Sequence, residues 1–507
     1  MTLEQKIGQV LCVGYQEDYA SAGIRELVAK HYIGGLCLFG RNYRDLNSMR
    51  QDLEDLQDEA IRASGVPLLI GVDQEGGTVN RFSGELTHFP GAMAQAATGD
   101  AQTAYEIGRA KGAELLALGI NVNFAPVLDI NTNADNPVIG VRSYGGDRET
   151  VAAYASAYAR GLQESGVLAT GKHFPGHGDT YLDSHFTLPK VDHPRERLEG
   201  EELYPFKVLI DQGIGLIMTT HIIFPAFDPS GVPATLSRPV LTELLRERMG
   251  FSGIIITDCM EMKAIADFYG TAQAAKMALD AGADMILVCH TRDVQLECIR
   301  VLKEACLQDA ALMAKLDRAV ERLIRAKSAM PRTLGDMGVI GSTDIIGSDA
   351  HTALAARVGR DCLTMHRGSI PVFKKDEAFA AVFFGSGSTL ERRFGAYYTN
   401  AEIFSLPMNP SAADKDGLLE RIAKYDSVII FSRDAIFAEI QGETVREILK
   451  IRPGAAVVAT GSPYDLQRFP AALNYVCAYE RTFHVADGIL AMLKGEFTPH
   501  ASDVLRK

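Results

Sequence analysis

The first 330 residues of the chain alternate between short apolar runs of strand length and longer segments with helical periodicity. The apolar runs lie at 11–15, 34–39, 68–73, 122–127, 167–171, 216–221, 254–258 and 285–290. Near-continuous apolar strands separated by helices are typical of a parallel sheet whose faces are covered. Eight such units in about 300 residues predict an α/β fold with a (β/α)8 barrel of the TIM type. A doubly wound open sheet is the alternative that the pattern leaves open.

A second, smaller domain is expected after the barrel. An amphipathic helix over 312–330 ends against Pro331, and the Gly/Ser/Asp-rich stretch 335–349 that follows lacks a helical period. Beyond it, strands at 379–385, 427–432 and 455–460 alternate with helices such as 416–425. We therefore expect a catalytic barrel over 1–332, a linker over 333–360 and an open α/β sandwich domain over 361–507.

The net charge, the apolar runs and the opening residues of the chain argue against several classes of partner and location. The formal net charge is −13, which disfavours binding to nucleic acid or to anionic lipid. No apolar run approaches the roughly 18 residues of a membrane span, and the opening MTLEQKIGQVLCVGY lacks the features of a signal peptide. The eight cysteines show no CxxC spacing, which suits a reducing compartment. A cytoplasmic protein is expected, although a secreted protein whose leader had been removed would begin in the same way.

The segment 171–189, GKHFPGHGDTYLDSHFTLP, concentrates the candidate catalytic side chains on one loop. Its prolines and glycines prevent a helix, and loops at strand ends commonly carry function. Asp183 and His185 are two positions apart, so the carboxylate can accept the ring N–H of the imidazole and favour its charged form. Such a histidine can protonate a leaving group and later take a proton from a nucleophile. For His177 and Asp179, a structural role in the turn is favoured.

The same loop permits a second interpretation as a metal site. Histidine and aspartate side chains are competent metal ligands, and the loop holds several of them: His173, His177, Asp179, Asp183 and His185. Their spacing lacks the helical HExxH arrangement, however. We therefore expect neither a metal nor a cofactor.

Polar residues stand at the ends of the expected strands, where a barrel places its active site. These residues are Asp73, Asp129, Lys172, His173, His221, Asp258 and His290. Asp258 closes the apolar run GFSGIIITD, and cationic neighbours such as Lys172 would keep it ionised, as a nucleophile must be. For Asp129, His221 and His290, a structural role is an equal alternative.

Four motifs together carry a family resemblance. KHFPGHGDTYLDSH (172–185), GVDQEGGTVNRF (71–82), NPVIGVRSYGGD (136–147) and GFSGIIITDCMEMKAI (250–265) resemble the family 3 glycoside hydrolases, and more narrowly the β-N-acetylglucosaminidases of peptidoglycan recycling. The resemblance implies that Asp258 is the nucleophile and that His185, paired with Asp183, is the acid/base. It also implies that the sugar is bound by Asp73, Arg81, Arg142, Lys172 and His173.

The resemblance implies a retaining exo-β-N-acetylglucosaminidase that releases GlcNAc from GlcNAc-MurNAc or GlcNAc-anhydroMurNAc. One alternative is a phosphorylase of the same family, because a neutral histidine does not repel an incoming phosphate as a carboxylate would. A sugar-binding protein without catalysis is a further alternative. The expected partner is a small carbohydrate or muropeptide, and the sequence leaves the oligomeric state open.

Overall fold

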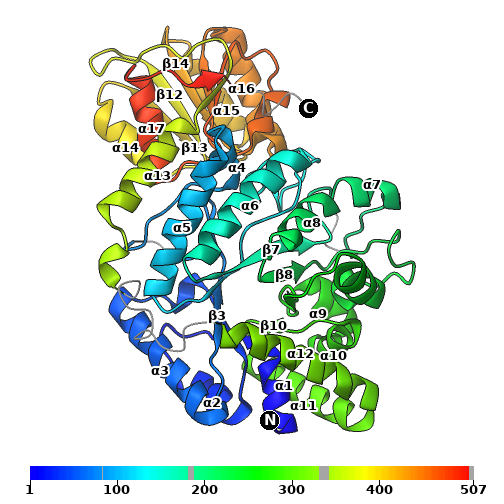
Figure 1. Ribbon diagram of the computed structural model, residues 1–507. Helices are drawn as coiled ribbons and strands as arrows, with labels where there is room; N and C mark the ends of the chain where they lie inside the picture. The colour runs from blue at the N-terminus through cyan, green and yellow to red at the C-terminus, as the bar shows by residue number, and fades with distance from the viewer. Residues whose placement is uncertain (83, 181–187, 330–341, 502–507) are drawn as a thin grey trace.

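The barrel is the larger of two domains in the computed structural model, which describes residues 1–82, 84–180, 188–329 and 342–501 (Figure 1). Eight strands form one parallel sheet in the order β10-β1-β2-β3-β6-β7-β8-β9. A parallel bridge between Ile256 and Met285 joins its two ends, which closes the barrel. The strands are β1 (Leu11–Val13), β2 (Gly35–Leu38), β3 (Leu69–Val72), β6 (Val122–Asn123), β7 (Leu168–Phe174), β8 (Leu216–Thr219), β9 (Ile254–Ile256) and β10 (Ile286–Val288). The predicted barrel is confirmed.

Most helices of this part of the chain cover the outside of the barrel. Several begin at a side-chain cap; α3, for example, starts after Asp45, whose carboxylate accepts the Ser48 N–H, and ends at Gly65 in the left-handed region. The helices are α1 (Leu3–Gln9), α2 (Ala22–His31), α3 (Leu46–Ser64), α4 (Ala92–Ala97), α5 (Ala101–Ala117), α6 (Arg148–Glu164), α7 (Arg195–Gly200), α8 (Leu203–Asp211), the π-helix η4 (Pro239–Arg248), α9 (Lys263–Tyr269), α10 (Thr271–Ala281), α11 (Arg292–Gln308) and α12 (Ala310–Ser328). Short 3₁₀ turns are η1 (Gly40–Asn42), η2 (Gly140–Arg142) and η3 (Ala234–Leu236). In the described ranges, none of the helices combines the length and apolarity needed to span a membrane.

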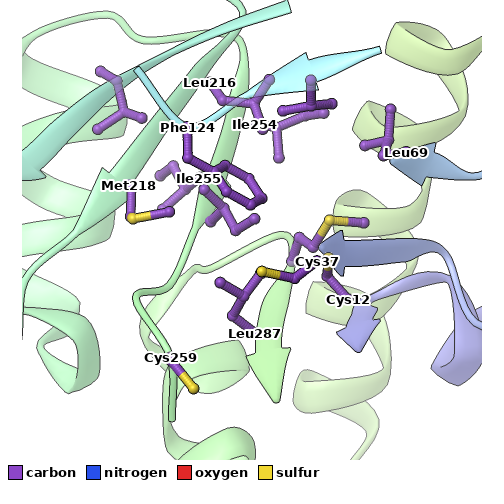
Figure 2. Packing of buried hydrophobic residues seen from close by; sticks show 14 of the residues in the cluster. Cys12, Cys37, Leu69, Phe124, Leu216, Met218, Ile254, Ile255, Cys259 and Leu287 are labelled. Atoms are coloured by element: carbon purple, nitrogen blue, oxygen red, sulfur yellow. The ribbon is translucent and has the colours of Figure 1, made fainter. Parts of the chain in front are cut away.

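The interior of the barrel is filled by apolar side chains from different strands. Figure 2 shows Phe124 among these residues, together with Ile255 and Leu287. Gly71 on β3 makes room for the aromatic ring, because a Cβ at this position would lie 2.4 Å from a Phe124 ring carbon. All eight cysteines are buried free thiols. The barrel centre is therefore a packed core, and function must lie at its rim.

The second domain is built on an open sheet with strand order β13-β12-β14-β15-β16-β11-β17. Its strands are β11 (Thr364–Arg367), β12 (Ala380–Phe384), β13 (Glu402–Leu406), β14 (Val428–Ser432), β15 (Ala456–Ala459), β16 (Asn474–Cys477) and β17 (His500–Ala501). All pairings are parallel except that between β11 and β16. Its helices are α14 (Thr389–Tyr397), α15 (Ala412–Ile422), α16 (Glu439–Ile451) and α17 (Phe483–Leu493), with 3₁₀ turns η7 (Ala435–Phe437) and η8 (Pro463–Gln467). The predicted open α/β domain is confirmed.

The two domains share a packed junction, at which α4 and α13 (Asp349–Asp361) lie (Figure 1). The side chains of Met93 and Ala97 on α4 belong to the hydrophobic core of the second domain. The carboxylate of Glu480, which follows β16, accepts the backbone N–H of Gly91 at 2.9 Å. Within the expected linker, the described residues form η6 (Thr343–Ile345) and most of α13. The domain limits at 332 and 361 stay a prediction.

Candidate active site

Lys172 is held between two carboxylates at the carboxyl end of β7. Its Nζ lies 2.7 Å from Asp73 Oδ1 and 2.6 Å from Glu75 Oε1. The Lys172 side chain is only 2% exposed, whereas that of Asp73 is 20% exposed. Burial alone would lower the pKa of Lys172, but the two carboxylates outweigh it and raise the pKa. A lysine cation is thus fixed beside an aspartate that a ligand can reach.

Glu75 and Arg81 come from the hairpin β4 (Gln74–Gly76) and β5 (Val79–Asn80), directly after β3. Gly77 turns this hairpin with φ +56, a conformation that glycine adopts without strain. Arg81 follows β5, and its Nη2 lies 3.8 Å from Asp73 Oδ2. The Arg81 side chain is 38% exposed, so its charge remains accessible at the rim.

Arg142, which ends η2, forms a two-pronged ion pair with Glu75. Its Nε donates to Oε2 at 3.0 Å and its Nη2 donates to Oε1 at 2.8 Å. Burial alone would raise the pKa of Glu75, but Arg142 and Lys172 outweigh it and hold the pKa well below the usual range. The same pairing raises the pKa of the Arg142 guanidinium against the effect of its burial. Glu75 is therefore a buried anion between two cations.

His173 is oriented by Asp129, which lies beyond the end of β6. The Asp129 carboxylate contacts His173 Nδ1 at 2.7 Å and also accepts the backbone N–H of His177. Burial lowers the pKa of His177 to about 4, so this ring is neutral at pH 7. His177 Nδ1 lies 3.1 Å from Thr180 Oγ1, whereas Asp179 pairs with His193, 14 positions along the chain.

Asp258 stands two residues after the end of β9 and is partly exposed. Its Oδ1 accepts the backbone N–H of Cys259 at 2.7 Å. Burial alone would raise the pKa of this carboxyl group, but His221 and His173 outweigh that effect and hold the pKa below its usual value. His221 is buried and contacts the Cys259 carbonyl at 3.0 Å through Nε2. Asp258 is thus kept anionic, as nucleophilic attack requires.

The structure accordingly groups six of the eight residues that the sequence assigns to the site. Asp73, Lys172 and Arg142 are linked through Glu75, while Lys172 and His173 both act electrostatically on Asp258. Arg81 joins the group through Asp73. The proposed acid/base pair, Asp183 and His185, lies outside the described residues.

Glu75, which pairs with both Arg142 and Lys172, was not among the site residues predicted from the sequence. A usable signal was present, because side chains two positions apart on an extended chain point to the same side, and Glu75 follows Asp73 by two. The sequence places Asp129 at the end of an expected strand, but it does not predict the contact with His173, which forms only in the folded chain. Within the described ranges, His, Cys, Asp and Glu side chains form no group of three that could hold a metal ion.

Comparison with known families gives a match over most of the chain. A family model described as "Glycosyl hydrolase family 3 N terminal domain" matches residues 2–326. A beta-hexosaminidase from Tolumonas auensis is 41% identical over 271 residues, covering 53% of this chain and 79% of that protein. Beta-hexosaminidase A from Pseudoalteromonas piscicida is 35% identical over 363 residues, or 67% of this chain. This chain spans 60% of the length of that relative.

A solved structure extends the similarity to both domains. It is a glycoside hydrolase family 3 beta-N-acetylglucosaminidase from Paenibacillus sp. str. FPU-7, with a TM-score of 0.88 and 35% sequence identity. The superposition covers 98% of each chain. The arrangement of the barrel and the second domain is therefore shared with that enzyme.

Proposed function

The chain belongs to glycosyl hydrolase family 3 and is a glycoside hydrolase, and we propose that it is a retaining exo-β-N-acetylglucosaminidase. The observation that carries this proposal is the partly exposed Asp258 carboxylate, kept anionic on the same barrel rim as Lys172 and His173. The names of the relatives, beta-hexosaminidase and beta-N-acetylglucosaminidase, support the choice of sugar.

In the first step, an Asp258 oxygen attacks the anomeric carbon and displaces the aglycone oxygen. In our proposal His185, as a general acid paired with Asp183, gives a proton to that oxygen as the bond breaks. The product is a glycosyl-enzyme ester on Asp258 with inverted configuration. In the second step, neutral His185 takes a proton from water, whose oxygen displaces Asp258 and restores the β configuration.

The sugar-binding residues supply complementary hydrogen-bonding groups. Asp73 keeps carboxylate lone pairs for sugar hydroxyl groups, since its side chain is partly exposed. Lys172, Arg142 and Arg81 are donors to hydroxyl or acetamido oxygens. His173, fixed through Nδ1 by Asp129, offers Nε2 to the ligand.

The substrate class that we propose is a peptidoglycan fragment in which GlcNAc is linked to MurNAc or anhydro-MurNAc. Its basis is the loop ending in Asp183-Ser184-His185, which resembles the peptidoglycan-recycling branch. A cytoplasmic location suits this role and is supported by the eight buried free thiols. Release of GlcNAc from purified GlcNAc-anhydroMurNAc, compared with chitobiose, tests this substrate class.

The acceptor in the second step is tested with an aryl β-N-acetylglucosaminide, incubated with and without millimolar phosphate. Free GlcNAc at an unchanged rate supports a hydrolase. A rate that depends on phosphate and yields GlcNAc 1-phosphate would favour the phosphorylase alternative. Asp258→Asn serves as the blank, and absence of any product from the native enzyme would contradict both activities on this sugar.

A further inference from the structure

A single buried carboxylate joins two of the side chains that are proposed to bind the sugar. Both oxygens of Glu75 are occupied: Oε1 receives Arg142 Nη2 and Lys172 Nζ, and Oε2 receives Arg142 Nε. The Glu75 side chain is 7% exposed, compared with 20% for Asp73. Asp73 is therefore the accessible carboxylate, while Glu75 is committed to protein partners.

We propose that Glu75 is a positioning residue of the sugar subsite, which fixes Arg142 and Lys172 for the ligand without touching it. This inference rests on the proposed function. A two-pronged carboxylate pair defines the plane of a guanidinium, and the shared Oε1 ties the lysine to the same place.

A count of hydrogen-bond donors supports the view that Glu75 positions the two cations while their remaining donors bind the sugar. Arg142 has five N–H groups: Nε and one on Nη2 bond Glu75, and one on Nη1 bonds the Val138 carbonyl. The contacts between described residues thus leave one N–H on Nη1 and one on Nη2 of Arg142 for a ligand. Lys172 has three, of which Asp73 and Glu75 take two. The donors that remain for a sugar thus belong to groups whose placement Glu75 sets.

The backbone of Glu75 is anchored as well. Lys111 on α5 donates from Nζ to the Glu75 carbonyl at 2.6 Å and is itself buried. The second domain approaches the same hairpin, because a Cβ on Gly77 would lie 2.5 Å from Glu480 Oε2. The hairpin is therefore anchored to the barrel through Lys111, and the second domain lies close to its turn.

The test compares Glu75→Gln with Glu114→Gln. Glu114 is a matched control, since its buried carboxylate bonds Thr87 and His351 away from the proposed sugar residues. For an aryl β-N-acetylglucosaminide we expect Glu75→Gln to raise KM by about tenfold or more, because loss of a charged hydrogen bond loosens both cations. Glu114→Gln should leave KM within about twofold. Equal KM changes in the two variants would overturn the proposal.

A double-mutant cycle separates positioning from general destabilisation. In the Arg142→Met, Lys172→Met background, Glu75→Gln should add less than about twofold to the loss of kcat/KM, because the groups it positions are absent. If Glu75→Gln lowered kcat/KM by the same factor in this background as in the native enzyme, the proposal would be overturned. If Glu75→Gln does not fold, Glu75→Asp keeps the charge and withdraws it by one methylene, and an intermediate rise in KM is expected. An unchanged KM in Glu75→Asp would then count against the role.

A readout that needs no substrate keeps this inference separate from the proposed activity. The Arg142 Nε–H should exchange slowly with solvent in native enzyme and at least about tenfold faster in Glu75→Gln, as observed by NMR and assigned with Arg142→Lys. Unchanged exchange would overturn the positioning role. If the native enzyme fails to cleave the aryl substrate, the proposed function fails, while the exchange experiment still decides whether Glu75 holds Arg142.

Discussion

His173 Nδ1 lies 2.7 Å from Asp129 Oδ2, and the other oxygen of the same carboxylate accepts the backbone N–H groups of His173 and His177. A carboxylate only accepts, so Nδ1 carries the hydrogen of this bond and Nε2 is left for the ligand. Both ring orientation and tautomer are set by one buried side chain. Asp129 therefore supports the proposed sugar subsite by fixing the ring of His173.

We expect Asp129→Asn to reduce kcat/KM by about tenfold or more, because an amide can donate to Nδ1 and shift the hydrogen to Nε2. Steady-state kinetics with an aryl β-N-acetylglucosaminide measures this. The control is Asp228→Asn, since Asp228 is a buried loop carboxylate bonded to Ser237 and Ser230. Native kcat/KM in Asp129→Asn would show that the contact does not matter for binding or turnover.

Replacement of Asp258 tests the nucleophile. Asp258→Asn should lower kcat by about 10⁴-fold or more, since the amide cannot form the glycosyl ester. A second variant, Asp258→Gly, tests the same role by rescue. Added azide can enter the space left by the side chain and attack the anomeric carbon directly, so the product should be an α-glycosyl azide. Asp267→Asn, at an exposed position of the neighbouring helix α9, is the control. A β-glycosyl azide, or near-native turnover by Asp258→Asn, would rule out the assignment.

His185→Ala should discriminate between leaving groups. Activated aryl glycosides need little protonation, so their first step should be slowed much less than that of disaccharides, whose alkoxide leaving groups need a general acid. The ratio of the two kcat/KM losses is the measurement, with His193→Ala as a control for a histidine next to the same loop. Equal losses on both substrate types would count against the acid role of His185.

The barrel could be predicted from the sequence because most buried strands leave a short, mainly apolar run, as Ile254–Ile256 does for β9. The position of the polar residues at the barrel rim could be predicted as well, since the carboxyl ends of parallel strands collect at one face. The role of Glu75 could not be derived in this way. It depends on Arg142, 67 positions along the chain, meeting the hairpin after β3, which no local pattern encodes. The same holds for α4, which lies within the barrel sequence but packs into the core of the second domain.

Lys327 on α12 provides a test of stability that is independent of catalysis. Its Nζ is buried and donates to Gln9 Oε1 and to the Gly34 carbonyl, both at 2.7 Å. Burial lowers the pKa of Lys327 from 10.5 to about 7. Between pH 7 and 10.5 the unfolded chain therefore binds more protons than the native protein, so this lysine makes stability rise with pH.

Below pH 7 the lysine is charged in both states and its burial destabilises the fold fully, whereas above pH 10.5 it is neutral in both. Lys327→Met removes this dependence. The free energy of unfolding of the native protein minus that of Lys327→Met should therefore increase from pH 7 to pH 10, by at most about 1.4 kcal/mol per pH unit. Urea unfolding followed by circular dichroism at pH 6, 8 and 10 measures this difference, with Lys303→Met, at a partly exposed lysine, as control. Parallel stability profiles for native protein and Lys327→Met would contradict a lowered pKa, because the slope difference arises only from a proton that the unfolded chain retains and the folded chain releases.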